Sequence, residues 1–136
     1  MFRFIVAWLV YTWGGLHRYF GNKNNMRSEH ERAVHYFSRA YEIDPSFYQA
    51  RLARAVLLWR ELGRSNEALG DLNALLAADP TYGPALLNRA MVAQEHGRYR
   101  AALDDLEAYL NLPDVEYHGE AGRMAALLRE MLAGEG

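Results

Sequence analysis

Residues 63–80 read GRSNEALGDLNALLAADP, and this stretch decides the fold. It opens with Gly63, a residue type that commonly ends a helix, and Ser65 is of a type that caps a new one. Thirteen residues, most of them good helix formers, then lead to Asp79-Pro80, where a helix must stop. The stretch therefore predicts the second helix of a helical hairpin.

Copies of this stretch recur along the chain. A separation of 34 residues relates Gly63 to Gly97, and the same separation holds for the pairs Ala68 and Ala102, Leu72 and Leu106, Asp71 and Asp105, and Leu52 and Leu86. A looser copy, SEHERAVHYFSRAYEIDP, occupies residues 28–45 with a spacing of 35. So many matches at one period indicate a tandem structural repeat.

Each repeat is expected to hold two helices joined at a glycine. We expect Ser46 with Gln49 to cap the helix that ends near Leu62, and Thr81 to cap the next first helix. Pro84 would lie in the first turn, where a missing N–H is harmless. The packing stripe of the earlier helix is predicted to comprise Leu52, Ala55, Val56 and Trp59.

The repeat resembles the tetratricopeptide repeat family. The residues that carry the resemblance are Gly63, Ala68, Leu72, Asp79 and Pro80, with Gly97, Tyr99, Ala102, Leu106 and Pro113 one period later, and Ala33, Phe37, Ala40 and Pro45 before them. The resemblance implies an all-α, right-handed α-α superhelix of antiparallel hairpins, with about three repeats and a C-terminal capping helix. It departs from the family where Leu52 and Leu86 replace an aromatic residue.

The chain is predicted to divide into an apolar N-terminal helix over residues 1–21 and a repeat domain over 22–136. The domain would end in an amphipathic closing helix at 120–133, because a stack of hairpins needs its last apolar face covered. The predicted stripe of this helix is Ala121, Met124, Leu127, Leu128, Met131 and Leu132.

Residues 4–13 read FIVAWLVYTW and would form a helix that is apolar all round. Three interpretations remain open: a first solenoid helix covered by something, a short membrane anchor, and a secretory signal peptide. An anchor of roughly 13–16 residues is short for a ~30 Å hydrocarbon core. The basic residues that follow it would place the rest of the chain on the cytoplasmic side. The predicted docking residues are Phe4, Ile5, Trp8, Leu9 and Trp13.

The run NKNNM at 22–26 is expected to be a loop, with Gly21 as the C-cap of the first helix. Ser28 and Glu31 are spaced as a capping box for the next helix.

Composition excludes several classes of function. The net charge of −2 argues against a nucleic-acid module, and the absence of cysteine excludes disulfides and thiolate metal sites. His30 and His35 are five residues apart on a helix, so they do not face one ion, and both are expected to be solvated. No grouping of residues suggests catalysis, so we predict no enzyme, cofactor or metal site.

Binding is what remains, because the first helices of stacked hairpins line a concave surface. Arg54 and Asn88 lie at equivalent positions and could hold a carboxylate or a peptide backbone. The family's groove for a chaperone's C-terminal carboxylates is rich in Lys and Asn, whereas Pro84 and Leu87 stand where cations are expected, so that activity is not carried over. The predicted groove is Ala53, Arg54, Leu57, Glu61, Leu87, Asn88, Met91 and Glu95.

Two functions are therefore expected as alternatives. The first is a cytoplasmic scaffold that binds a protein or peptide in the groove. The second is a subunit or assembly factor of a membrane complex, docked through residues 1–20 at the cytoplasmic face of the membrane. The same apolar helix could also join two copies of the chain.

Overall fold

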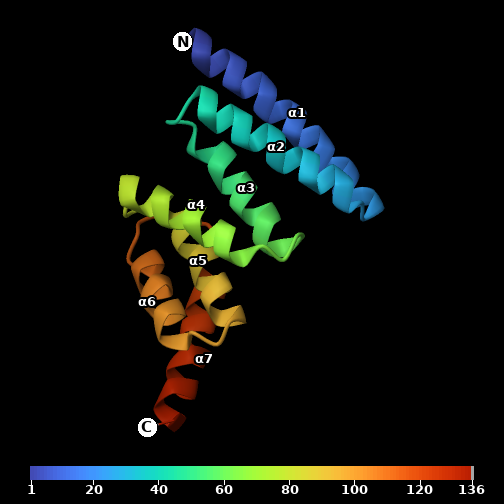
Figure 1. The fold of residues 1–136 in the computed structure, drawn as a ribbon. Coiled ribbons are helices and arrows are strands. Elements are labelled where there is room, and N and C mark those ends of the chain that lie inside the picture. Colours follow the sequence, from blue (N-terminus) through green and yellow to red (C-terminus); the bar gives the residue numbers. More distant parts are fainter. Residues whose placement is uncertain (136) are drawn as a thin grey trace. The chain divides into compact units, whose positions relative to one another are not determined.

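A computed structural model describes residues 1–135, and this part of the chain is entirely helical (Figure 1). The helices are α1 (Phe2–Asn24), α2 (Arg27–Ile43), α3 (Tyr48–Arg60), α4 (Ser65–Ala78), α5 (Gly83–Glu95), α6 (Tyr99–Leu110) and α7 (His118–Glu135). The prediction of an all-α chain of short antiparallel helices is confirmed.

The chain forms two compact units. The first is Met1–Asp71, which contains α1, α2, α3 and the start of α4; the second begins at Leu72. The predicted division into an N-terminal helix over 1–21 and a repeat domain over 22–136 stays a prediction.

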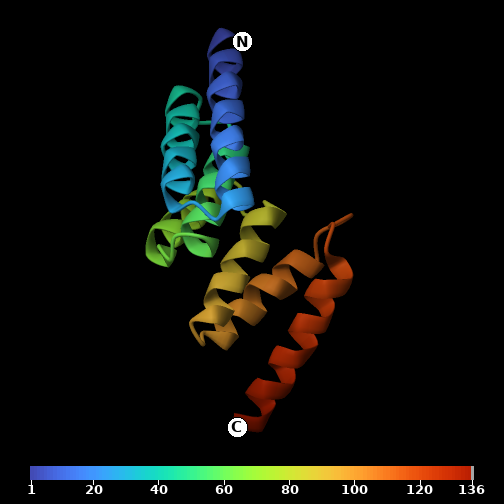
Figure 2. The same cartoon turned by 90° about the vertical axis from the view of Figure 1, so that its right-hand side faces the viewer.

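In the first unit, α1 and α2 lie side by side along most of their lengths (Figures 1 and 2). Small residues of α1 at seven-residue spacing, Ala7, Gly14 and Gly21, are buried. A Cβ atom on Gly14 would lie 2.9 Å from the ring of Phe37, which is itself fully buried. The absence of a side chain therefore lets the two helices approach closely.

The end of α1 differs from the prediction. The helix continues through Gly21 to Asn24 and ends at Asn25, which adopts the left-handed conformation with φ of 52°. Gly21 is buried against the ring of His30, where a Cβ would lie only 2.6 Å from Cδ2. Close packing, and not termination, therefore explains this glycine, and the loop expected at 22–26 shrinks to its last two residues.

The predicted serine and threonine caps are also wrong. α2 begins at Arg27, α3 at Tyr48 and α5 at Gly83, and none of these helices has a side-chain hydrogen bond at its N-cap. The hydroxyls of Ser46 and Thr81 instead donate to Asp44 and Asp79, at Oγ···Oδ1 distances of 2.6 and 2.8 Å.

These two aspartates each form a compact turn between helices. The same Oδ1 atom of Asp44 also accepts from the backbone N–H of Ser46 at 3.1 Å, and Asp79 accepts from Thr81 at 3.0 Å. An aspartate that bonds the backbone two residues ahead mimics a backbone turn. The Asp-Pro-Ser and Asp-Pro-Thr segments therefore connect one hairpin to the next.

The glycine turns within the hairpins are confirmed. Gly63 and Gly97 have φ values of 65° and 74°, which favour glycine. After Gly97, the N–H of Arg98 donates to the carbonyl of Ala93 at 2.8 Å and the N–H of Gly97 donates to Gln94 at 3.0 Å. This pair of bonds is a Schellman motif and satisfies the carbonyls at the end of α5.

The second unit is built on α5, α6 and α7. α6 packs against both of the other helices, and Val92, Ala102 and Leu106 are buried. α7 extends a little beyond the predicted 120–133 and buries Ala121, Ala125 and Leu128. Its predicted apolar stripe is wider than its buried face, because Leu127 and Met131 are exposed.

Candidate functional site

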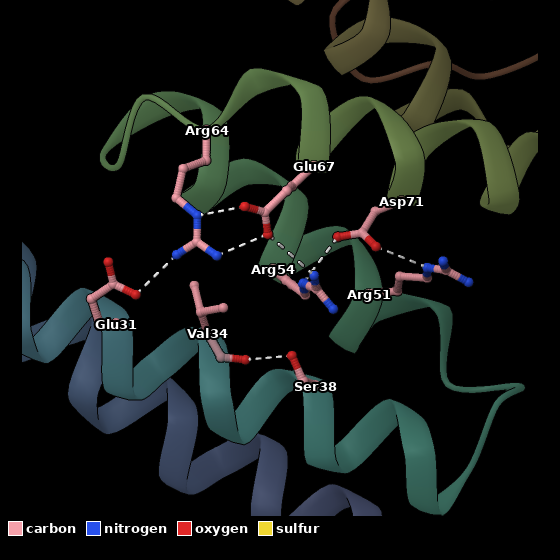
Figure 3. Close-up of polar contacts among 8 residues, drawn as sticks. All are labelled: Glu31, Val34, Ser38, Arg51, Arg54, Arg64, Glu67 and Asp71. Atoms are coloured by element: carbon pink, nitrogen blue, oxygen red, sulfur yellow. Dashed lines mark hydrogen bonds and ion pairs between the residues drawn. The ribbon is translucent and has the colours of Figure 1, made fainter.

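Arg54, a predicted groove residue, turns its guanidinium toward α4 (Figure 3). Its Nε lies 3.3 Å from Oδ2 of Asp71, and its Nη2 lies 3.8 Å from Oε2 of Glu67. Both carboxylates belong to α4, so Arg54 joins the two helices of its own hairpin. Its charge is compensated within the chain before any ligand arrives.

Asp71 is the centre of this contact. Its side chain is buried, and a second arginine of α3, Arg51, donates from Nε to Oδ1 at 3.1 Å. Arg51 also lies over the ring of Tyr41 and donates to its hydroxyl at 2.6 Å. Burial raises the pKa of the Asp71 carboxyl, although Arg54 and Arg51 both lower it. These contacts stabilise the hairpin and are not a free anion site.

A second ionic group joins the start of α4 to α2. Arg64 forms a bidentate pair with Glu67 at 2.8 Å for both contacts and donates from Nη1 to Glu31 at 3.0 Å (Figure 3). The hydrogen bond from Arg64 lowers the pKa of Glu67, and the same bond raises the pKa of Arg64. All three side chains are partly exposed, so solvent screens their attraction.

The other predicted groove residues of α3 divide between core and surface. Ala53 and Leu57 are buried, so their side chains pack inside the protein, whereas Glu61 is exposed. The buried face of α3 includes Ala50, Leu57 and Leu58, which is rotated from the predicted stripe.

The predicted groove residues of α5 are more accessible. Leu87, Asn88 and Met91 are partly exposed and Glu95 is exposed. The amide of Asn88 donates to the carbonyl of Pro84, one turn earlier, at 2.8 Å. Because Arg54 and Asn88 lie in different units, a groove that joins them stays a prediction.

The predicted docking residues of α1 all lie on its exposed side. Phe4, Ile5, Trp8, Leu9 and Trp13 each expose between 47% and 56% of their surface. The polar residue among them, Thr12, directs its hydroxyl to the carbonyl of Trp8 at 2.8 Å. This surface continues with further exposed apolar side chains, namely Phe2, Leu16, Tyr19 and Phe20. Apolar residues recur all round α1, so their periodicity does not show which side α2 covers.

His30 corrects the expectation that both histidines of α2 are solvated. It is buried against Gly21, and its Nε2 lies 2.8 Å from Oδ1 of Asn22. His35 is exposed and meets Tyr36 edge to face. Within residues 1–135, no group of three or more His, Asp or Glu side chains could hold a metal ion.

His17 is a contact that the sequence did not single out. Its Nδ1 lies 2.6 Å from Oε2 of Glu29, and its ring stacks on Tyr36 at 5.3 Å between centroids. The hydrogen bond from His17 lowers the pKa of Glu29, assisted by Arg32. The contact between His17 and Glu29 joins α1 to α2.

Among the described helices, none is both long enough and apolar enough to cross a membrane.

The structure defines a class of protein, the solenoid of antiparallel helical hairpins with surfaces suited to protein contacts. A tetratricopeptide repeat and J domain-containing co-chaperone, DNJ1 of Cryptococcus neoformans, is 30% identical over 91 residues, covering 65% of this chain and 17% of that protein. A DnaJ homolog subfamily C member 7 homolog of Dictyostelium discoideum is 31% identical over 94 residues, covering 64% and 17%.

Among solved structures, the P58(IPK) TPR domain matches with a TM-score of 0.69 and 26% identity, over 88% of this chain and 33% of that chain. The chain is a tetratricopeptide repeat protein with the fold of a TPR solenoid. It spans about a sixth of the length of the two curated relatives. No protein-family profile matches the chain.

Proposed function

We propose that the chain is a non-enzymatic scaffold that binds a peptide or helix of another protein through the groove face of α5. The observation that carries the proposal is the accessible set Leu87, Asn88, Met91 and Glu95 on the first helix of a repeat hairpin. First helices of stacked hairpins supply the concave binding surface in repeat proteins. One similar protein is named a co-chaperone, which also supports a role in binding other proteins.

The contacts of Arg54 change how the groove should be tested. Replacing Arg54 would leave Asp71 buried with one cation fewer, so loss of binding could reflect loss of structure. Substitutions on α5 avoid this difficulty, because Leu87 and Met91 are only partly buried.

The experiment is selection from a random peptide library on the full chain, followed by affinity measurement of enriched peptides. We expect Leu87→Glu/Met91→Glu to weaken binding at least tenfold, because two carboxylates replace apolar contacts. Leu127→Glu on α7 is the matched control, since Leu127 is also an apolar surface residue. The proposal fails if no peptide is enriched, or if the α5 variant binds as tightly as the control while melting at the same temperature.

A second candidate function is docking of the chain through α1 as part of a membrane complex. The specific observation is the continuous exposed apolar side of α1. Removing α1 would be a poor test, because it would uncover Phe37 and other core residues of α2. Substitutions on the exposed side of the complete chain are required instead.

A further inference from the structure

The exposed side of α1 is large for a surface feature. Nine large apolar side chains between Phe2 and Phe20 expose from 42% to 78% of their surface. At roughly 200 Å² for each side chain, they present about 900 Å² of apolar area. The largest apolar patch of an ordinary monomer is roughly 300–600 Å². An exposed apolar face of this size is typical of a site that contacts a protein or a membrane.

Charge around this face points to an anionic occupant. The helix itself carries Arg3, Arg18 and Lys23 and no acidic residue, whereas Arg27 belongs to α2 and lies 3.8 Å from Glu31. Together, α1 and α2 hold six basic and three acidic side chains, whereas the rest of the chain holds nine and fourteen. A second copy docked through α1 would bring only like charges from this helix together, so charge disfavours self-association here.

The two sides of α1 differ in shape. Toward α2 the helix presents Ala7, Gly14 and Gly21, the small residues that a tightly packed helix neighbour requires. The outer side has bulky residues on successive turns, including Trp8, Trp13 and Tyr19. A protein partner would need a matching pocket for each ring, whereas a lipid headgroup layer adapts to them, and Trp and Tyr favour that interface.

We infer that α1 lies flat in the headgroup layer of a bilayer that contains anionic lipids. The rings and aliphatic side chains of the outer side enter the boundary with the acyl chains, and Arg3 and Lys23 contact lipid phosphates or carboxylates near the two ends of the helix. Apolar burial and attraction to anionic lipids together bind such helices. This inference rests on the second candidate function of α1 and is independent of peptide binding by α5.

The experiment is flotation of the full chain with two kinds of vesicle, phosphatidylcholine alone and phosphatidylcholine mixed with phosphatidylserine. We expect at least tenfold stronger binding to the mixed vesicles, weakened by added salt. In a Trp59→Phe background, the fluorescence of Trp8 and Trp13 should shift to shorter wavelength when mixed vesicles are added. Equal binding to both vesicles, or no binding to either, overturns the inference.

Two variants separate the apolar from the electrostatic contribution to vesicle binding, and a third serves as the control. Leu9→Glu/Leu16→Glu places charge on the outer side and should abolish binding, whereas Leu127→Glu/Met131→Glu on α7 should not change it. Arg3→Gln/Lys23→Gln should lose the preference for phosphatidylserine while keeping weak binding to phosphatidylcholine. If lipid-free sizing shows a dimer that Leu9→Glu/Leu16→Glu dissociates, a second copy covers the face and the inference is wrong.

The two proposals can fail separately. Leu9→Glu/Leu16→Glu should leave peptide affinity unchanged, and Leu87→Glu/Met91→Glu should leave flotation unchanged. Loss of both activities in a variant that still melts at the temperature of the parent chain would mean that one surface serves both functions.

Discussion

Arg89 and Asp105 are joined by two hydrogen bonds, from Nε at 2.8 Å and from Nη2 at 2.7 Å. Asp105 is the repeat equivalent of Asp71, and each of these buried carboxylates meets an arginine from the first helix of its own hairpin. The arginines occupy different positions in the repeat: Arg51 and Arg54 pair with Asp71, whereas Arg89 pairs with Asp105. The carboxylate is therefore the part of the contact that both hairpins share.

Asp105→Ala is expected to lower the free energy of unfolding by about 2 kcal/mol, because Arg89 loses a charged partner and keeps only a 3.0 Å bond to Asn73. Urea denaturation measures this. Glu42→Ala is the matched control: it breaks an exposed pair with Arg39 and should change stability by less than about 0.5 kcal/mol. Equal effects of the two substitutions would contradict a structural role for Asp105.

Substitutions at Gly14 and Gly15 test how closely α1 packs against α2. Gly14→Ala would place Cβ 2.9 Å from a fully buried Phe37 ring, and we expect a loss of about 1–3 kcal/mol in stability. At Gly15 the nearest atom to a new Cβ is the mobile end of Arg18 at 3.9 Å. Gly15→Ala should therefore stabilise the helix by about 0.5–1 kcal/mol. Similar melting temperatures for the two variants would show that the helices are not so closely packed.

A left-handed glycine and a helical glycine with open space around its Cβ should respond in opposite directions to replacement by alanine. Gly97→Ala should cost about 1–2 kcal/mol, because φ is 74° and open space around Cβ does not relieve backbone strain. Gly70→Ala, in the interior of α4 with no atom near its Cβ, should gain about 0.5–1 kcal/mol. Thermal melts compare them, and Gly97→Asn should fall between Gly97→Ala and the parent chain because Asn tolerates this conformation. An unchanged melting temperature in Gly97→Ala would argue against a left-handed backbone conformation at this position.

Glu29 makes part of the stability dependent on pH. Hydrogen bonding to His17 holds its folded pKa below the ordinary 4.5, so on acidification the unfolded chain takes up this proton first. Its stabilisation is complete above 4.5 and disappears as pH falls through the lowered value. We expect Glu29→Gln to melt below the parent chain at neutral pH, and the two melting temperatures to converge in acid.

Arg32→Gln, which removes the lesser partner of Glu29, should show a smaller difference of the same sign. A gap between Glu29→Gln and the parent chain that is equally wide in neutral and acid solution would mean that the carboxylate charge is not what stabilises this contact.

Much of the fold follows from the sequence because the repeat spacing is read over many residues at once. Gly63, Gly97 and Pro84 lie where the period placed them, and the turns have the expected geometry. The caps were missed because Ser46 can bond either a helix N-terminus or Asp44, and the choice between such short-range partners depends on backbone geometry.

The candidate groove was less predictable. To assign it to one face of α3, one must know which side of α3 is covered by α4. The sequence prediction places Arg54 on the open side, whereas its guanidinium contacts carboxylates of α4. One signal was present: Asp71 is flanked by Ala68, Leu72 and Leu75, which share its side of the helix. A carboxylate on a buried face needs a cation from a neighbouring helix, and Arg51 and Arg54 were the available ones. In α1, likewise, the spacing of Ala7, Gly14 and Gly21 marks the covered side.

The turns at Asp44 and Asp79 make the solenoid modular. In each turn, one aspartate oxygen accepts both the backbone N–H and the hydroxyl of the residue two positions ahead. A copy of residues 44–78 inserted at Asp79 would begin and end on the same local joint. Gene duplication can lengthen the chain in this way without a new hydrophobic core, because each added hairpin buries its apolar face only against the hairpins next to it.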